Sequence, residues 1–201
     1  MPGFEETLRS LTGAWRIFLN RPEALRLFDF SVDGFWRSFA AIVFLLPCYA
    51  LLVLAERVRI LTDSIPDQGF NSGVFFLNKV VAIGLDWILL PVLLAFAARP
   101  LGISRSYGAY IVTRNWGAVL ATIPFGLIAL LSLLGWINDD LATFLSLVML
   151  AVVFRYGYLI ARRVLGFDIG FAIGLVAADF CLSLILVGFI DTLFSYFSAG
   201  A

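Results

Sequence analysis

The sequence contains no histidine, only two cysteines and a single lysine, and 14% of its 201 residues carry charge. The lack of histidine excludes Ser-His-Asp hydrolases, Cys-His peptidases and the usual histidine-ligated zinc and haem sites. Cys48 and Cys181 lie far apart inside apolar runs, so we interpret them as packing residues without a disulfide. No Walker loop, dinucleotide-binding glycine pattern or Cys-x-x-Cys pair occurs. We therefore predict a protein that is not an enzyme and holds no cofactor or metal.

Apolar side chains make up most of the chain. Hydrophobic residues account for 62% of it, and the mean hydropathy is +0.99. Soluble domains carry roughly 25% charged residues, and one soluble core cannot hide this many apolar groups. The bilayer is therefore the expected partner of much of the surface. The net charge is zero, so no global basic field attracts nucleic acid, and we expect no nucleic-acid partner.

Five apolar segments approach the roughly 20 residues that a helix needs to cross a bilayer. They are Phe39–Ala55, Leu77–Ala98, Asn115–Trp136, Leu141–Ala161 and Ile169–Phe197. This pattern predicts an all-α fold, a polytopic membrane bundle of five transmembrane helices. We expect a transmembrane domain over residues 39–201, preceded by a separate region over residues 1–38.

The region 1–38 is too charged to span a membrane, but it is amphipathic. Its apolar residues recur at spacings of four and three, which places them on one helical face: Phe4, Leu8, Leu11, Trp15 and Phe18. The pattern predicts an interfacial helix lying on the membrane surface, or alternatively a helix packed on the protein's own cytoplasmic loops. Glu5 and Glu6 occupy the place of a basic n-region, so we expect no cleavable signal peptide.

Basic residues are distributed asymmetrically between the two sides of the predicted bundle. Ten fall on the N-terminal side: Arg9, Arg16, Arg21, Arg26, Arg37, Arg99, Arg105, Arg114, Arg162 and Arg163. Three fall on the other side: Arg57, Arg59 and Lys79. Because cytoplasmic segments carry the excess of Lys and Arg, we predict a cytoplasmic N-terminus and, with five helices, an external C-terminus.

Four ionisable residues lie within the apolar segments: Asp86, Arg155, Asp179 and Asp191. A charge in hydrocarbon is costly, so we expect such residues to face the bundle interior and find partners. At about 1.5 Å per residue, Asp86 and Asp179 lie at similar depth and Arg155 comes within reach of Asp179, whereas Asp191 lies near the outer end and is expected to be hydrated. The residues predict either a proton or cation site built on one arginine, or an ion pair that fixes helix register.

The last apolar segment begins with a stripe of small residues at intervals of four: Gly166, Gly170, Gly174 and Ala178. Small residues at this spacing let two helix backbones approach closely. We predict that the stripe packs against another helix of the bundle, in which case a bulky residue at Gly174 damages folding. The alternative is a homo-oligomer or partner interface through this helix.

Three stretches carry a family resemblance: RPEALRLFDFSVDGFWRSFAA (Arg21–Ala41), YIVTRNWGAVL (Tyr110–Leu120) and FRYGYLIARRVLGFDIGFAIGLVAADF (Phe154–Phe180). A proline-led helix before the first span, five spans and an aromatic–basic turn before a glycine-rich last span resemble bacterial members of the Yip1-like family.

The resemblance implies a non-enzymatic protein of a bacterial inner membrane that acts in membrane organisation or as a scaffold for a partner protein. It assigns no functional residue. The alternative, drawn from the buried charges, is a small ion-coupled transporter or permease subunit that uses Asp86, Asp179 and Arg155.

Overall fold

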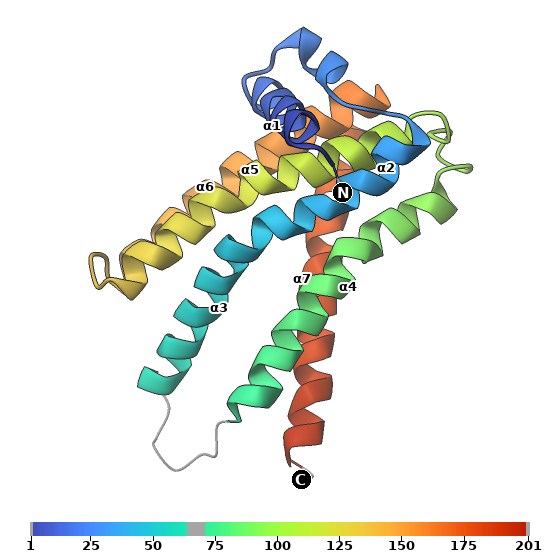
Figure 1. The fold of residues 1–201 in the computed structure, drawn as a ribbon. Coiled ribbons are helices and arrows are strands. Elements are labelled where there is room, and N and C mark those ends of the chain that lie inside the picture. Colours follow the sequence, from blue (N-terminus) through green and yellow to red (C-terminus); the bar gives the residue numbers. More distant parts are fainter. Residues whose placement is uncertain (1, 64–70, 200–201) are drawn as a thin grey trace.

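The computed structural model describes residues 2–63 and 71–199, and these residues are helical nearly throughout (Figure 1). The α-helices are α1 (Phe4–Phe18), α2 (Val32–Ser38), α3 (Ile42–Asp63), α4 (Ser72–Ala97), α5 (Tyr107–Leu133), α6 (Asp139–Leu165) and α7 (Ile169–Ala199). Two 3-10 segments, η1 (Pro22–Leu27) and η2 (Phe39–Ala41), precede α2 and α3.

Five helical segments are long and apolar enough to cross a membrane, which confirms the predicted all-α, five-span fold. They are Val32–Thr62, Ser72–Ala97, Tyr107–Leu133, Asp139–Leu165 and Ile169–Tyr196. The first runs through α2, η2 and α3 without a break, so it begins before the predicted domain boundary at residue 38 and continues past the predicted end at Ala55.

The spans form two groups (Figure 1). Helix α5 packs between α3 and α6, whereas α4 pairs with α7, and α7 in turn contacts α6. The groups lie close together at the end that carries α1 and diverge toward the other end. We call the α1 side the cap end and the opposite side, with the start of α4 and of α6, the far end. At the far end Asn71 and Asn138 cap α4 and α6, each accepting a backbone N–H from three residues on (3.1 and 2.9 Å).

The closest helix contacts occur at glycines of α5. A Cβ atom at Gly126 would lie 2.9 Å from the Sγ atom of Cys48 on α3, and one at Gly117 would lie 2.8 Å from Ile160 on α6. The glycines of the α7 stripe, by contrast, have no atom within 4 Å of that position: Gly166, Gly170 and Gly174. Ala178 is exposed as well. The prediction that this stripe packs within the bundle is therefore wrong, because α7 contacts its neighbours through its other face, with Ala172 and Leu175 buried.

Residues 2–38 fold onto the ends of α5 and α6 and form what we call the N-terminal cap. The small face of α1 is buried, including Ser10, Gly13 and Ala14. The Tyr156 hydroxyl of α6 donates to the Ala14 carbonyl at 2.8 Å. Arg163, two residues before the end of α6, donates to the side chain and the carbonyl of Asn20 at 2.6 and 2.7 Å. The cap therefore packs on helices of the bundle, while contact of its other side with the membrane stays a prediction.

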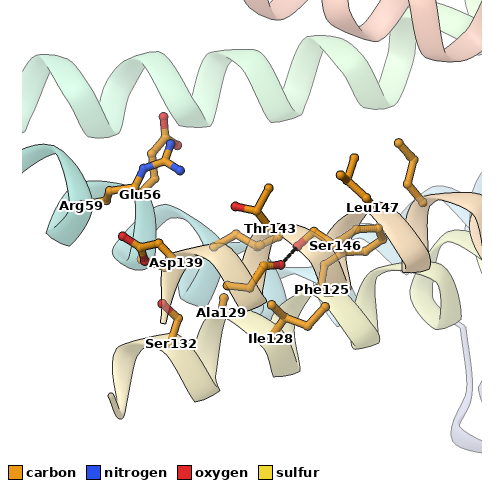
Figure 2. A pocket seen from close by; sticks show the side chains of 14 residues that line it. Glu56, Arg59, Phe125, Ile128, Ala129, Ser132, Asp139, Thr143, Ser146 and Leu147 are labelled. Atoms are coloured by element: carbon orange, nitrogen blue, oxygen red, sulfur yellow. Dashed lines mark hydrogen bonds between the residues drawn. The ribbon is translucent and has the colours of Figure 1, made fainter. Parts of the chain in front are cut away.

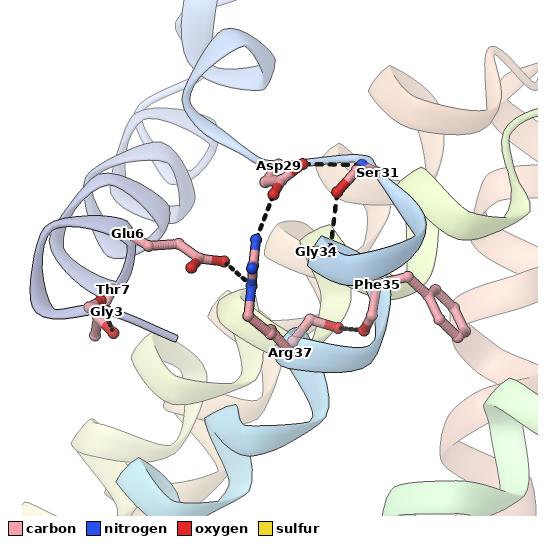
Figure 3. A network of polar contacts seen from close by, with 9 residues as sticks. Gly3, Glu6, Thr7, Asp29, Ser31, Gly34, Phe35 and Arg37 are labelled. Atoms are coloured by element: carbon pink, nitrogen blue, oxygen red, sulfur yellow. Dashed lines mark hydrogen bonds and ion pairs between the residues drawn. The ribbon is translucent and has the colours of Figure 1, made fainter. Parts of the chain in front are cut away.

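Within the cap, Arg37 of α2 binds both α1 and the turn before α2 (Figure 3). Its Nε atom lies 3.0 Å from Oε1 of Glu6 on α1, and its Nη2 atom lies 2.7 Å from Oδ2 of Asp29. Hydrogen bonds from Ser31, together with the charge of Arg37, hold the pKa of Asp29 below its ordinary value of 3.8. Gly34 makes this turn possible, since any Cβ atom there would collide with the Asp29 carbonyl.

Gly126→Val and Gly174→Val are expected to distinguish a glycine at a close helix contact from a glycine at an open position. The valine at position 126 must displace Cys48, so Gly126→Val should lower the free energy of unfolding by about 1–3 kcal/mol. Gly174→Val should change it by less than about 0.5 kcal/mol, because the site is open. Thermal unfolding of the purified chain in detergent measures both, and equal losses in the two variants would contradict the packing described here.

Candidate functional site

A pair of opposite charges lies between α5 and α7, inside the spans. Helix α5 begins at Tyr107, so Arg114 is roughly 10 Å along it. The Nη2 atom of Arg114 lies 3.1 Å from Oδ1 and 3.3 Å from Oδ2 of Asp179, and Nε lies 3.4 Å from Oδ2. The two side chains are only 17% and 28% exposed. This forked contact is the geometry in which a guanidinium and a carboxylate attract each other most strongly.

The predicted pair of Arg155 and Asp179 is wrong. Arg155 is exposed, and its Nη1 atom donates to the carbonyl of Phe18 in the cap at 3.4 Å. Counting residues along each helix predicts the height of a side chain in the membrane, but it does not fix the rotation of each helix about its own axis. Asp179 turns toward α5, where Arg114 meets it.

Asp86 belongs to the same group of charges. It lies on α4 and accepts a short hydrogen bond from the Ser183 hydroxyl of α7. Arg114 also interacts electrostatically with Asp86, and Tyr49 on α3 interacts with both of them. Asp86 thus lies within electrostatic range of the Arg114–Asp179 pair, and the arginine differs from the predicted Arg155. We call Asp86, Arg114, Asp179 and Ser183 the charge cluster.

The charge cluster contains one more carboxylate than it contains basic groups. Two carboxylates face one guanidinium, and that guanidinium forms its ion pair with Asp179. Among the ion pairs within residues 2–63 and 71–199, none includes Asp86. An isolated carboxylate is expensive in a low-dielectric interior, and a proton or a bound cation relieves the cost. Asp86 is therefore the carboxylate of the charge cluster that forms no ion pair within the described residues.

The Arg114–Asp179 pair also joins the two groups of spans. Helices α5 and α7 make few or no close backbone contacts along the described chain, and α4 touches α3 and α5 only sparsely. A bidentate ion pair here adds a direct link between α5 and α7, beside the contact that α7 makes with α6.

Near the far end a second polar group surrounds the single lysine. The Nζ atom of Lys79 on α4 lies 2.8 Å from Oε1 of Glu56 on α3 and 3.8 Å from Oδ1 of Asp191 on α7. The Asp191 side chain is 49% exposed, and its hydration stays a prediction. Over the described residues no group of three or more acidic or cysteine side chains is arranged to hold a metal ion.

A cavity of about 500 Å³ opens between α3, α5 and α6, also toward the far end (Figure 2). Glu56 and Arg59 of α3 face Asp139 and Thr143 of α6 across it, and its deeper wall is apolar. The Ser146 hydroxyl in this wall donates to the Ala142 carbonyl at 2.8 Å, so its hydrogen bond is made within α6. Nothing in this wall requires a ligand.

Sequence reasoning missed Arg114 as a site residue because the predicted span begins at Asn115, directly after this charge. The available signal was the uncharged stretch from Tyr107 to Thr113, which continues the apolar pattern on the other side of the arginine. Ser183 was missed because the hydroxyl of a lone serine or threonine in an apolar helix often bonds to its own backbone. Thr113 and Thr122 on α5 do so.

Comparison with protein-family models, curated proteins and solved structures gives no match for this chain. The five long apolar helices decide the class. The chain is a multi-span membrane protein.

Arg114→Met is expected to destabilise the bundle strongly, because it leaves the Asp179 carboxylate without a partner among apolar helices. Loss of one member of a buried ion pair costs about 3–5 kcal/mol, and the partial exposure of this pair places the expected loss near the lower value. Arg155→Met removes an exposed arginine and should cost less than about 1 kcal/mol. Thermal unfolding in detergent compares the two.

The double variant Arg114→Met/Asp179→Asn provides the internal control. It removes both charges, so it should be more stable than Arg114→Met alone. A double variant that is less stable than the single one would show that Arg114 does not act through Asp179.

Proposed function

We propose that this protein binds and exchanges one proton or one small monovalent cation at Asp86, as a non-enzymatic, ion-coupled transporter or permease subunit. The observation that carries the proposal is the unbalanced negative charge of the charge cluster inside the spans. Ionisable residues within spans mark ion pathways and proton relays in pumps and transporters, so a functional site is the default hypothesis for them.

The surroundings of Asp86 suit a proton or a hard cation. Ser183 supplies a hydroxyl in direct contact, and the Tyr49 side chain lies close enough to interact electrostatically. Oxygen atoms of this kind are what small hard cations bind. The ion pair of Arg114 with Asp179 leaves Asp86 as the carboxylate whose charge an incoming ion neutralises.

The location of the cluster supports a coupling role. Asp86 and Ser183 link α4 to α7, while Arg114 and Asp179 link α7 to α5. A charge change at Asp86 alters the field at Arg114 and hence the contact that joins the two groups of spans. Relative movement of helix groups about a midplane site is how small transporters alternate access.

The proposal includes a cytoplasmic cap end in a bacterial inner membrane. Nine of the ten arginines assigned to that side lie in the cap, in the connection before α5 or in the last turn of α6, and only Arg114 lies deep within a span. Arg57, Arg59 and Lys79 lie at the far end. The excess of basic residues at the cap end supports its placement in the cytoplasm.

Asp86→Asn tests the proposal directly. In liposomes that contain the purified protein, a potassium gradient with valinomycin drives cations or protons inward, and pH-sensitive or sodium-sensitive dyes report their entry. Wild type should show flux of one of the two, and Asp86→Asn should reduce it by about tenfold or more because it removes the exchangeable charge. Asp140→Asn, which removes an exposed carboxylate at the far end, is the matched control. Absence of both fluxes in wild type, or equal flux in Asp86→Asn, would overturn the proposal.

A second candidate function rests on the cap. Large apolar side chains stand exposed along one edge of α1: Phe4 (79%), Leu8 (49%), Trp15 (50%) and Leu19 (48%). Because polar contacts hold the other side of α1 to α6, this edge is presented in a fixed position. That arrangement supports a Yip1-like role in membrane organisation or partner scaffolding, and the exposed α7 stripe supports a further contact with a partner or second copy.

Leu8→Ser/Trp15→Ser tests this second candidate. Both side chains lie on the exposed edge, so the double variant should fold normally yet lose a stoichiometric partner that co-purifies with the wild type. Trp136→Ser, which removes a 73% exposed aromatic at the far end, is the control. Retention of the partner by the double variant, or its loss from the control as well, would count against the cap as the docking surface.

A further inference from the structure

A groove of about 500 Å³ lies between α6 and α7, apart from the charge cluster. Its volume falls in the range of small-molecule sites, which run from about 300 to 1,000 Å³. Ile173 in its wall is 54% exposed, so the groove opens to the surroundings of the bundle. Both helices contribute to the lining: Phe154, Arg155 and Tyr158 of α6, and Ile173, Val176 and Ala177 of α7.

The two helices approach each other closely beside this groove. A Cβ atom at Gly157 of α6 would lie 3.3 Å from both methyl carbons of Val176, which also lines the groove. Phe154 and Phe180 meet edge to face further from the cap, with ring centroids 5.0 Å apart. The groove therefore follows the line of contact between α6 and α7, and an apolar wall stands at its end away from the cap.

The polar ends of the lining side chains lie at the edge of the groove. Arg155 and Tyr158 belong to the lining, yet the surface that it presents is almost wholly apolar. The Nη1 atom of Arg155 donates to the Phe18 carbonyl of the cap at 3.4 Å, and the Tyr158 hydroxyl accepts from Nη1 of Arg162 at 3.1 Å. Long side chains of this kind lay their stems on apolar surface and keep their polar heads outside it. An apolar groove thus has two guanidiniums on its cap side.

Both guanidiniums are available to an anion. Arg155 and Arg162 are seven residues apart on α6, so they lie on one face of it. In the part of the chain that the structure describes, neither forms an ion pair. Each has five N–H donors, and the hydrogen bonds above use one of them. None of the residues that line the groove is acidic, so none of them attracts the cationic part of a zwitterionic headgroup.

An apolar groove beside two cations matches an anionic phospholipid. Arginine binds phosphate oxygens through paired hydrogen bonds, and basic pockets between membrane helices bind anionic headgroups in this way. A second copy of the chain or an apolar partner helix would also cover the groove. Either one would enclose the guanidiniums without supplying an anion, and an unpaired charge among apolar helices is costly.

We propose that the α6–α7 groove binds one anionic phospholipid. The phosphate pairs with Arg155 and Arg162, and an acyl chain packs along Ile173, Val176 and Ala177. The proposal is independent of ion exchange at Asp86, because the groove shares no residue with the charge cluster.

The probes are dioleoylphosphatidylglycerol and dioleoylphosphatidylcholine, titrated into the full chain in detergent and followed by native mass spectrometry. Their acyl chains are identical, so any preference reports the headgroup. The wild type should bind one phosphatidylglycerol about tenfold or more tightly than phosphatidylcholine, which is the contribution of one hydrogen bond to a charged group.

Arginine variants locate the headgroup. Arg155→Gln and Arg162→Gln should each weaken phosphatidylglycerol binding by about tenfold, because each removes a charged donor to the phosphate. Both side chains are exposed, so the variants should fold. Arg105→Gln removes an exposed arginine from the connection between α4 and α5 and should leave binding unchanged.

Ala177→Phe tests the apolar wall independently of the arginines. Ala177 is exposed, so a phenylalanine there should fill the groove while the bundle stays folded, and phosphatidylglycerol binding should fall by about tenfold or more.

Equal binding of the two lipids by the wild type, or equal weakening by Arg105→Gln, would overturn the proposal. Unchanged binding in Ala177→Phe or in both groove arginine variants would do the same. Displacement of the lipid by inorganic phosphate alone would indicate a phosphate site, and a wild-type dimer that excludes the lipid would assign the groove to a second copy. Either result would contradict a lipid site.

Discussion

The pairing of Arg114 with Asp179 is the interaction on which the arrangement of the spans depends. Neither charge is tolerated alone among apolar helices, so each is satisfied only when α5 and α7 stand at one rotation and one height. Hydrophobic contact cannot impose this, because lipid tails are as apolar as leucine side chains. The α4–α7 group, which touches the rest of the bundle mainly through α6, is thereby fixed relative to α5.

How much the sequence could predict follows from what each kind of pattern encodes. Segment length and hydropathy gave all five spans, because the thickness of the bilayer sets the number of apolar residues directly. Segment length and hydropathy could not predict the partner of Asp179. That partner depends on the rotation of each helix about its own axis, and on the true start of α5, which lies before the charged Arg114. The close-packing glycines were likewise misplaced: Gly170, Gly174 and Ala178 on α7 face outward, while isolated Gly117 and Gly126 on α5 make the close contacts.

Helix α1 of the cap was interpreted either as a helix on the membrane surface or as a helix packed on the protein, and each interpretation fits one of its sides. The apolar spacing from Phe4 to Phe18 suggested a single apolar face, but the buried side of α1 includes the small residues Ser10, Gly13 and Ala14, and Gly13 packs against Phe28. Small side chains allow the close approach at which Tyr156 reaches the Ala14 carbonyl. The large side chains Phe4, Leu8 and Trp15 are consequently left on the exposed edge, and α1 has two distinct working sides.

Synthesis of the chain gives the Arg114–Asp179 pair a further consequence. The two residues are 65 positions apart, and α6 lies between them. A ribosome therefore delivers Arg114 to the insertion machinery well before Asp179 exists, so α5 is accepted before the ion-pair partner of its arginine is made, and Asp86 of α4 is the carboxylate of the charge cluster that is already present. The biogenesis of α5 and α7 is thus coupled: the first is stored near the translocation channel or with its arginine extended toward the headgroups, until arrival of the last helix completes the pair.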